Sequence, residues 1–199
     1  YGLAVRVAGQ LPTPTSELLS AREVRRLDPA TQCALIAARQ AWAQAFGSTA
    51  QVDPERLAVS FSPGMGCVTT VMDAWDTLRT KGPRRVAPTT VPALMPNAPA
   101  ATLAMEFTAR AGAHAPVSAC ASGAEAISYG ADLIRLGRAD VVVAGGCDDA
   151  LHPLTVAAFA AMRALSTNPD PAGACRPFAS DRDGFVLGQG AGALVLEAE

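Results

Sequence analysis

The feature that most constrains the fold is an unbroken apolar run, VVVAGG, within residues 139–146. A strand with one solvated face alternates polar and apolar side chains, whereas a strand covered on both faces is apolar throughout. The run therefore predicts a strand that is buried on both sides. A second buried strand is predicted for residues 191–199, AGALVLEAE, and a β-rich run, RLAVSF, occupies residues 56–61.

Segments with helical spacing separate these runs. Residues 20–46 repeat apolar side chains every three or four positions, which predicts one helix or a pair divided at Pro29. Further helices are predicted at 69–79, 98–110, 120–136 and 155–166. Because strands alternate with helices, the predicted fold class is α/β, with a sheet buried between helices.

Charge and cysteine usage exclude several classes of protein. With 16 Lys and Arg against 18 Asp and Glu, the net charge of -2 offers no footprint for nucleic acid or anionic lipid. The five cysteines contain no CxxC pair, so we expect neither a disulfide framework nor a metal site, and a reducing cytoplasm. The uncharged stretch 86–105 contains four prolines, which argues against a membrane span.

Residues 115–127, APVSACASGAEAI, predict a nucleophile. The pattern indicates an extended run, a sharp turn at Cys120 and then a helix that Gly137 ends. At a helix N-terminus, unsatisfied N–H groups and the macrodipole favour a thiolate. Small neighbours leave room for a substrate carbonyl and for N–H groups that bind its oxyanion: Ala119, Ala121, Ser122 and Gly123. The alternative is a buried packing cysteine, the commoner role of free cysteine.

Six motifs in a fixed order resemble those of the β-ketoacyl synthases, the condensing enzymes of fatty-acid and polyketide synthesis. They are SACASGAEAI (118–127), GRADVVVAGG (137–146), FAAMRALST (159–167), RPF (176–178), DRDGFVLG (181–188) and GAGALVLE (190–197). The chain is similar to the elongating synthases of dissociated, type II systems. Residues 82–101 and 109–123 are especially similar to those of actinobacterial mycolate and polyketide pathways.

The resemblance implies a thiolase-like fold with layers in the order α-β-α-β-α. Residues 1–199 correspond mostly to the N-terminal half of such a synthase, and the sequence begins without methionine, so we expect a piece of a longer protein. The resemblance also places residues 86–97 and the strand at 140–146 near a dimer interface. The implied assembly is a homodimer or a heterodimer of a ketosynthase with a chain-length factor.

The implied activity is a decarboxylative Claisen condensation of a cysteine-bound acyl chain with malonyl-acyl carrier protein. Cys120 matches the acylated cysteine, and its own N–H matches one of two oxyanion donors. The family's two catalytic histidines belong to motifs absent from this sequence, and His114 and His152 match neither. The alternative is a non-catalytic pairing or scaffold subunit. No metal or dissociable cofactor is implied, because the phosphopantetheine arrives on the carrier protein.

Five further residues receive roles from the resemblance. Met65 and Phe159 match residues of the acyl pocket and its entrance, and we expect both to contact substrate; ordinary core packing is the alternative. Arg84, Arg85 and Arg163 match positions that meet the acidic carrier protein, a role that a basic patch would suit. Solvated surface charge is the alternative for each arginine.

The sequence departs from the family pattern at five positions. Ser62, Pro63 and Cys67 replace residues of a glycine loop, Ala179 stands where an aspartate is common, and Gln189 replaces an acidic residue. We expect altered ion pairing near the active site, which leaves the substrate range open.

Overall fold

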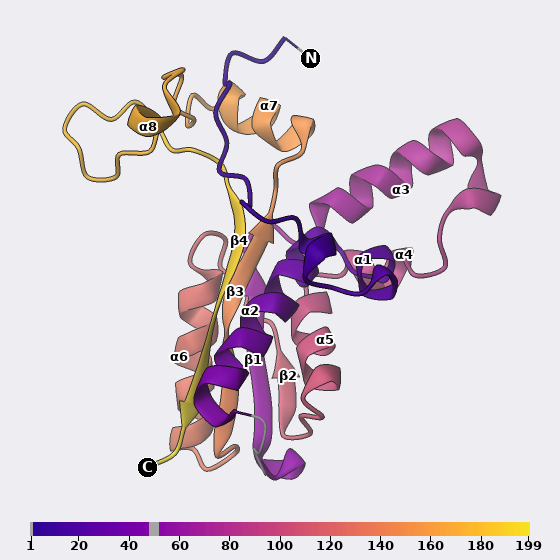
Figure 1. The fold of residues 1–199 in the computed structure, drawn as a ribbon, viewed down its shortest axis with the longest axis vertical. Helices are drawn as coiled ribbons and strands as arrows, with labels where there is room; N and C mark the ends of the chain where they lie inside the picture. The colour runs from indigo at the N-terminus through magenta and orange to yellow at the C-terminus, as the bar shows by residue number, and fades with distance from the viewer. Residues whose placement is uncertain (1, 48–51) are drawn as a thin grey trace.

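The computed structural model describes residues 2–47 and 52–199, whose strands form one four-stranded sheet (Figure 1). The strand order is β2-β1-β3-β4, with bounds Gly112–His114, Leu57–Pro63, Val141–Asp149 and Gln189–Glu197 respectively. β1 runs parallel to β2 and β3, whereas β4 pairs antiparallel with β3. The predicted strands at 56–61 and 139–146 are thus β1 and β3, and the α/β class is confirmed.

Helices cover the two faces of the sheet. α2 (Pro29–Phe46) and α5 (Ala98–Glu106) pack on one face, and α6 (Ser122–Arg135) packs on the other (Figure 1). The α6 face is closely packed, because a Cβ added at Gly130 would lie 3.1 Å from a methyl group of Val142. The core of the α2 and α5 face includes Ala34, Leu35, Leu57, Val59, Phe61, Leu103 and Val143.

β3 is covered on both faces, as its apolar run predicts. Val142 packs toward α6 and Val143 toward α2, and both are fully buried. β1 and β4 occupy its two edges, so its side chains and its backbone are satisfied within this chain. The expectation that this strand lies near a dimer interface stays a prediction, because no partner chain is part of the structure.

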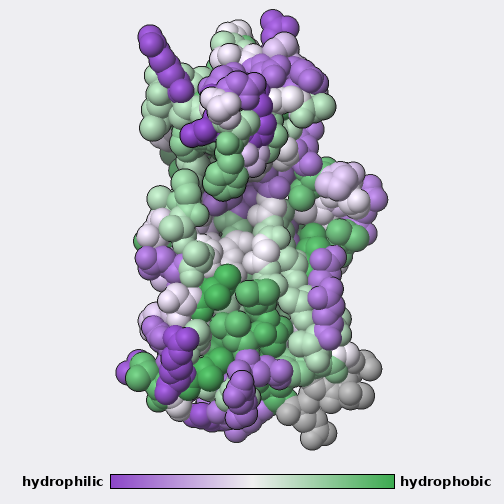
Figure 2. Space-filling model, turned by 90° about the vertical axis from the view of Figure 1, so that its left-hand side faces the viewer, coloured by the Kyte–Doolittle hydropathy of each residue, from purple (hydrophilic) through white to green (hydrophobic). Residues whose placement is uncertain are grey.

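β4 differs from the prediction of a second buried strand. Ala191, Ala193 and Val195 face α2, but Leu194 on the opposite face is 49% exposed. α2 covers only one face of this strand, and α6 reaches only the end near Leu196. Figure 2 shows apolar residues gathered on this side of the molecule, over β4 and α6.

The N-terminal helical pattern is a pair, α1 (Ala21–Arg26) and α2, divided before Pro29 as one of the two predictions had it. Ser20 and Glu23 form a capping box that begins α1. Asp28 caps α2 through the amide of Ala30, and proline at the first helical position needs no amide partner. Each helix therefore begins directly after a residue whose side chain accepts one of the first backbone amides.

Two groups of helices extend away from the sheet (Figure 1). One is the arm formed by α3 (Val68–Lys81), the 3-10 helix η3 (Pro83–Arg85) and α4 (Thr90–Leu94). The other is the lobe formed by α7 (Pro153–Ala161) and α8 (Pro171–Ala174). Two further short 3-10 helices are η1 (Thr15–Glu17) and η2 (Pro54–Arg56).

The predicted helices at 98–110 and 155–166 end early, at Glu106 and Ala161. Thr108 and Arg163 adopt positive φ angles of 58° and 55°, which a continuing right-handed helix does not allow. Across residues 2–47 and 52–199, none of the helices combines the length and the apolar character that a bilayer crossing requires.

Candidate active site

Cys120 lies at a sharp corner between β2 and α6. The preceding residue, Ala119, has a φ of 48°, a left-handed conformation that costs a residue with a Cβ free energy. Ser122 holds this corner, because its hydroxyl accepts the amide of Ser118 at 2.8 Å and donates to the Ala119 carbonyl at 2.7 Å. Ser122 is almost fully buried, whereas Cys120 is exposed.

The corner is confirmed, but the extended run before it is not a strand. β2 ends at His114, and within residues 115–119 only an isolated bridge joins Ser118 to Cys120. Pro116 has no N–H to give to a sheet ladder, so the pairing with β1 cannot continue through it. The prediction for the helix after it holds, since α6 follows and the positive φ of Gly137 closes it.

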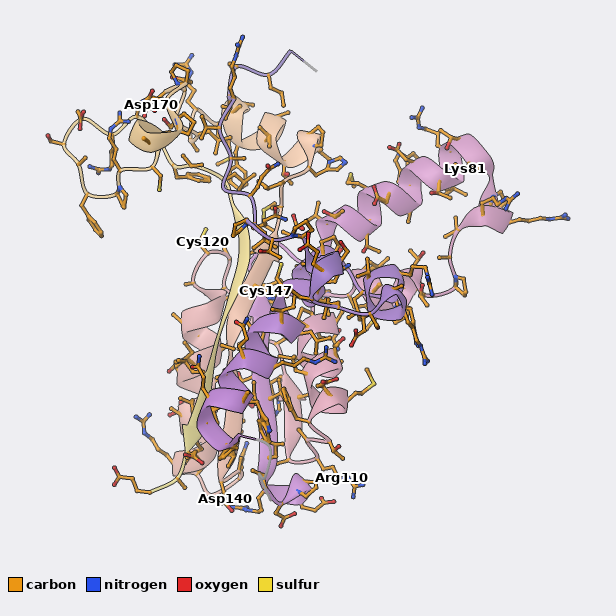
Figure 3. All side chains as sticks on the ribbon, viewed as in Figure 1. Lys81, Arg110, Cys120, Asp140, Cys147 and Asp170 are labelled. Carbon is orange, nitrogen blue, oxygen red and sulfur yellow. The ribbon has the colours of Figure 1, made fainter. Side chains whose placement is uncertain are left out.

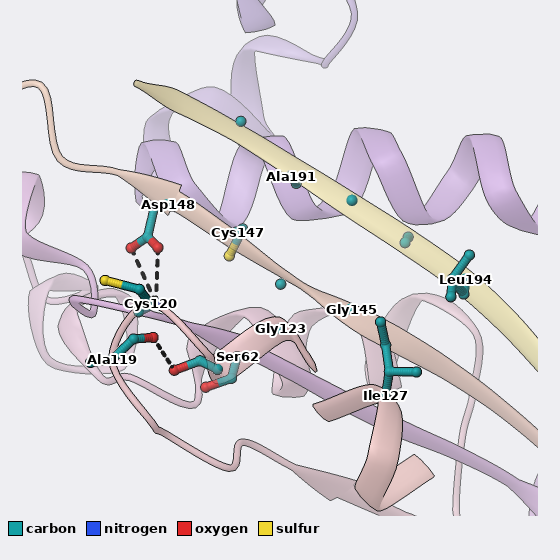
Figure 4. Close-up of a pocket in the computed structure, with 16 residues that line it drawn as sticks. Ser62, Ala119, Cys120, Gly123, Ile127, Gly145, Cys147, Asp148, Ala191 and Leu194 are labelled. Atoms are coloured by element: carbon teal, nitrogen blue, oxygen red, sulfur yellow. Dashed lines mark hydrogen bonds between the residues drawn. The ribbon is translucent and has the colours of Figure 1, made fainter. Parts of the chain in front are cut away.

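Cys120 opens onto a cleft of about 560 Å³ between the ends of β1, β3 and β4 and the first turns of α6 (Figure 4). The N-terminus of α6 lies at the rim, with its amide dipoles directed toward the cleft end that holds the cysteine. The lining comprises Ser62, Gly64, Ala119, Cys120, Ser122, Gly123, Ile127, residues 145–148 and residues 190–194.

Glycines bring α6 and β3 into backbone contact at this cleft. A Cβ added at Gly146 would lie 2.8 Å from the Cα of Gly123, closer than real Cβ contacts allow. A Cβ at Gly145 would lie 2.1 Å from the carbonyl oxygen of Gly192 on β4. The AGG sequence of β3 therefore permits the close packing that places the start of α6, and with it Cys120, against the sheet.

Asp148, at the end of β3, connects the loop after β1 to this site. Its carboxylate accepts the amides of Gly64, at 3.0 Å and 3.2 Å, and of Met65, at 3.0 Å. Burial raises the pKa of Asp148, and these two backbone hydrogen bonds oppose that rise. The residue types alone did not predict this carboxylate; an acidic residue two positions after the apolar run of β3 was the only signal.

The five free cysteines fall into two groups. Burial raises the pKa of Cys33 to about 11 and that of Cys67 to about 12, and it raises the pKa of Cys147 strongly. Cys120 and Cys175 are exposed. Because Cys120 is exposed and lines the cleft, the alternative of a buried packing cysteine does not apply to it.

The predicted acyl-pocket residues lie outside the lining of this cleft. Met65 follows Gly64 on the loop after β1, and its side chain is partly exposed. Phe159 lies in α7, where its ring packs edge-on against Phe185 at a centroid distance of 5.3 Å. The structure therefore brings Met65 next to the site, and it places Phe159 in the α7 lobe.

The predicted carrier-binding arginines do not form one patch. Arg84 and Arg85 lie in η3 at the outer end of the arm, just beyond Lys81 in Figure 3. Arg163 follows α7 and lines a different cleft, together with Arg176 and Arg182. All three predicted arginines are exposed, on two separate projections of the molecule.

Both histidines have structural contacts away from the cleft. The Nδ1 of His152 accepts the amide of Leu154 at 3.2 Å and caps α7, which suits a loop histidine ahead of Pro153. His114 lies in β2, and its ring packs against the ring of Tyr129 at a centroid distance of 4.9 Å.

Several departures from the family pattern have direct structural partners. The side-chain amide of Gln189 donates to Asp149 at 3.0 Å, and its oxygen accepts the amide of Leu11 at 3.2 Å. Pro63 ends β1 opposite Cys147. Near Ala179, Arg176 keeps ion pairs to Asp183 at 3.1 Å and to Asp181 at 3.6 Å. A glutamine beside Asp149 avoids the repulsion that an acidic residue would introduce there.

No cluster of three or more His, Cys, Asp or Glu side chains with the arrangement of a metal site occurs within the ranges 2–47 and 52–199.

Comparison with known proteins defines the class. The family described as "Beta-ketoacyl synthase, N-terminal domain" matches residues 7–199, so the chain belongs to the β-ketoacyl synthases. It is 40% identical, over its whole length, to the 3-oxoacyl-[acyl-carrier-protein] synthase 2 of Mycobacterium tuberculosis, of which it covers 48%. The chain therefore spans about half the length of the curated relatives that it matches.

Solved structures agree with the predicted thiolase-like fold. A β-ketoacyl synthase from Burkholderia phymatum superposes with a TM-score of 0.86 and 29% identity, over 100% of this chain and 49% of that one. A second structure, a ketosynthase bound to its type II polyketide acyl-carrier protein and to the hexaketide, gives a TM-score of 0.79 with 26% identity, over 99% and 48%. The described residues contain three of the predicted layers, α2 with α5, the sheet, and α6.

Proposed function

We propose that this chain supplies the nucleophile of a β-ketoacyl-acyl carrier protein synthase, and that Cys120 is that nucleophile. One observation carries the proposal: an exposed cysteine stands at a strained corner before α6, within a cleft walled by glycine backbone. Residues 1–199 are then the N-terminal portion of the synthase, and the relatives of about twice this length support that division.

The reaction proceeds in two balanced steps. The Cys120 thiolate attacks the carbonyl of an acyl thioester on the phosphopantetheine of a carrier protein; a carbon–sulfur bond forms, and the carrier thiolate leaves and takes up a proton. Malonyl-carrier protein then loses carbon dioxide, and the resulting enolate carbon attacks the acyl-enzyme carbonyl. The new carbon–carbon bond releases Cys120 as a thiolate.

The second step needs groups beyond those that line the cleft, whose described lining contains no histidine. We infer that the two catalytic histidines belong to the remainder of the full protein. Amide donors at the start of α6 would stabilise the oxyanion of each tetrahedral intermediate, a contribution worth about 3 to 4 kcal/mol per donor in other acyl-transfer enzymes.

The partner of the reaction is an acyl carrier protein, and we propose that Arg84, Arg85 and Arg163 contact its acidic surface. Exposure of the three guanidinium groups supports this role, and the solved carrier complex shows that such an assembly exists in a similar protein. Charge reversal at Arg163 should raise the KM for the carrier protein and weaken the dependence of that KM on salt.

Met65 and Phe159 are proposed to contact the acyl chain. Five free cysteines support a cytoplasmic location.

Intact-mass spectrometry of the full protein after incubation with acyl-carrier protein tests the assignment. The Cys120→Ala variant should carry no acyl group, whereas the Cys175→Ala variant, which removes the other exposed cysteine, should be acylated as the wild type is. Acylation of the Cys120→Ala variant, or absence of acylation in the wild type, would overturn the proposal. The second outcome would instead favour a non-catalytic pairing subunit.

A further inference from the structure

We propose that Asp148 is a positioning residue of the acyl-transfer site, whose carboxylate holds the Gly64–Met65 loop against the Cys120 corner. The inference rests on the proposed function and adds a residue that the motifs did not indicate. The proposed nucleophile just before α6 and the loop that follows β1 are far apart in the sequence but meet in the structure.

The first observation is the set of hydrogen bonds that Asp148 accepts. β1 and β3 are parallel neighbours, and Pro63 pairs with Cys147, so the residues that follow them leave the sheet side by side. The Asp148 carboxylate bridges this gap by accepting the amides of Gly64 and Met65 at 3.0 Å. Hydrogen bonds from amides to a carboxylate are stronger than those between neutral groups, so they fix the loop.

The second observation is the position of Gly64 between Asp148 and the corner. A Cβ added to Gly64 would lie 2.7 Å from Oδ2 of Asp148 and 2.9 Å from the carbonyl oxygen of Ala119. Ala119 is the residue with the strained backbone next to Cys120. The loop is therefore held on one side by the carboxylate and meets the corner on the other.

The third observation is the place of Asp148 in the cleft. Its side chain lines the same cleft as Cys120 and lies at the same end of it (Figure 4). A half-buried carboxylate that makes no ion pair in the described residues costs free energy unless amide donors satisfy it. Its two loop amides supply those donors, so the charge and the loop conformation stabilise each other.

The contacts of Asp148 should affect how the site accepts an acyl chain. Met65, the proposed acyl-chain contact, is held through its backbone by Asp148, and Gly64 touches the corner that carries the nucleophile. Loss of the carboxylate would let the loop shift relative to Cys120, and a displacement of 1 Å at a reacting centre costs up to about a hundredfold in rate. Longer acyl chains, which reach farther past the loop, should be affected most.

The test compares Asp148→Asn with Asp149→Asn in the full protein. Asp149 is the adjacent carboxyl group. It is also half-buried and has a raised pKa, but it accepts a hydrogen bond from Gln189 and does not bind the loop.

For Asp148→Asn we expect kcat/KM for acyl transfer to fall about tenfold to a hundredfold, with the largest loss for the longest chains. Alkylation of Cys120 by iodoacetamide should remain within about twofold of wild type, because that small reagent does not need the loop. Asp149→Asn should keep the wild-type chain-length profile.

Two results would overturn the proposal. One is an unchanged chain-length profile in Asp148→Asn, and the other is an equal loss of acyl transfer and iodoacetamide alkylation, which would mean that Asp148 only maintains the fold. Asp148→Glu, which keeps the charge but moves it by one methylene, provides the same comparison if the asparagine variant does not fold. Each result presumes that wild-type Cys120 is acylated, so failure of the proposed function is detected separately.

Discussion

Helices α2 and α3 both carry apolar side chains at helical spacing, yet their surroundings are opposite. In α2, Ala30, Ala34 and Ala38 are 0% exposed and pack on the sheet. In α3, Val71, Trp75 and Leu78 are 38%, 57% and 41% exposed, and the helix contains no buried residue. Periodicity thus specifies an apolar face, but the tertiary structure decides whether anything in the chain covers it.

The residues of the proposed site are likewise divided between the packed body around the sheet and the outlying helices. Cys120, Ser122 and Asp148 line the cleft where the start of α6 meets the end of β3, against the sheet. Arg84 and Arg85 lie on the arm, and Phe159 and Arg163 lie on the lobe. The proposed nucleophile therefore lies against the sheet, whereas the residues proposed to contact the carrier protein and the acyl chain at the pocket entrance lie on outlying segments.

Truncation of one large side chain in each region would give the largest difference. Phe61 is fully buried in β1, so Phe61→Ala should lower the free energy of unfolding by about 3 to 5 kcal/mol. Trp75→Ala on the arm should change it by no more than about 0.5 kcal/mol. Chemical denaturation of the full protein measures both. A loss above about 1 kcal/mol for Trp75→Ala would show that the arm is packed in the full protein, and the contrast would fail.

Two glycines on the neighbouring strands β3 and β4 allow the same comparison of packed and open positions within the sheet. Gly145→Ala should destabilise the protein by about 2 to 3 kcal/mol, because its Cβ would overlap the Gly192 carbonyl and the Phe61 ring. Gly192→Ala is the matched control, since a Cβ there meets nothing within 4 Å, and its effect should stay within about 0.5 kcal/mol. Similar unfolding midpoints for the two variants would contradict the close packing of β3.

Gln189 links the sheet to the outlying N-terminal segment. Gln189→Glu would place a carboxylate beside Asp149, and we expect a loss of about 1 to 2 kcal/mol at neutral pH. Burial already raises the pKa of Asp149, so acidification should protonate the pair and restore part of this stability. Gln189→Ala loses the same hydrogen bonds without adding charge, and its deficit should not recover at low pH. Thermal unfolding at several pH values separates the two; a pH-independent deficit in Gln189→Glu would exclude the repulsion.

The smallest effect is expected at the surface ion pairs between helices. Arg39 of α2 pairs with Glu23 of α1 at 2.7 Å and with Glu106 of α5 at 2.6 Å. Hydrogen bonds from Ser20, together with Arg39, lower the pKa of Glu23 from 4.5 to about 2. Because the folded-state pKa is depressed, this stabilisation is present above the ordinary value and is lost as pH falls toward 2.

Glu23→Gln keeps the capping geometry but removes the charge. Relative to this variant, the wild type should be more stable by about 0.5 to 1 kcal/mol at neutral pH, and the difference should vanish in acid. Thermal unfolding of both proteins from neutral pH to pH 2 checks this. A difference that persists at the lowest pH would mean that the ionised Glu23 carboxylate does not stabilise α1.

Much of the fold was predictable from local pattern. The burial of β3 followed from its apolar run, the division of the N-terminal helical pattern at Pro29 was one of two predictions, and the turn at Cys120 followed from small residues before a helical segment. These features depend on neighbours in the sequence, which is why pattern alone detects them. Helix ends at Glu106 and Ala161 were missed, because left-handed residues stop those helices where no glycine or proline marks the end.

By itself, the amino-acid sequence determined the α/β class, the position of the nucleophile candidate and the family, because those depend on periodicity and on motifs within short segments. Only the tertiary structure decided that β4 has one open face, that the arginines lie on two projections, and that Asp148 binds the loop after β1. Each of these depends on which distant segments meet. Parallel pairing of β1 with β3 brings residues 64 and 148 together, and a strand's apolar run does not reveal its neighbour.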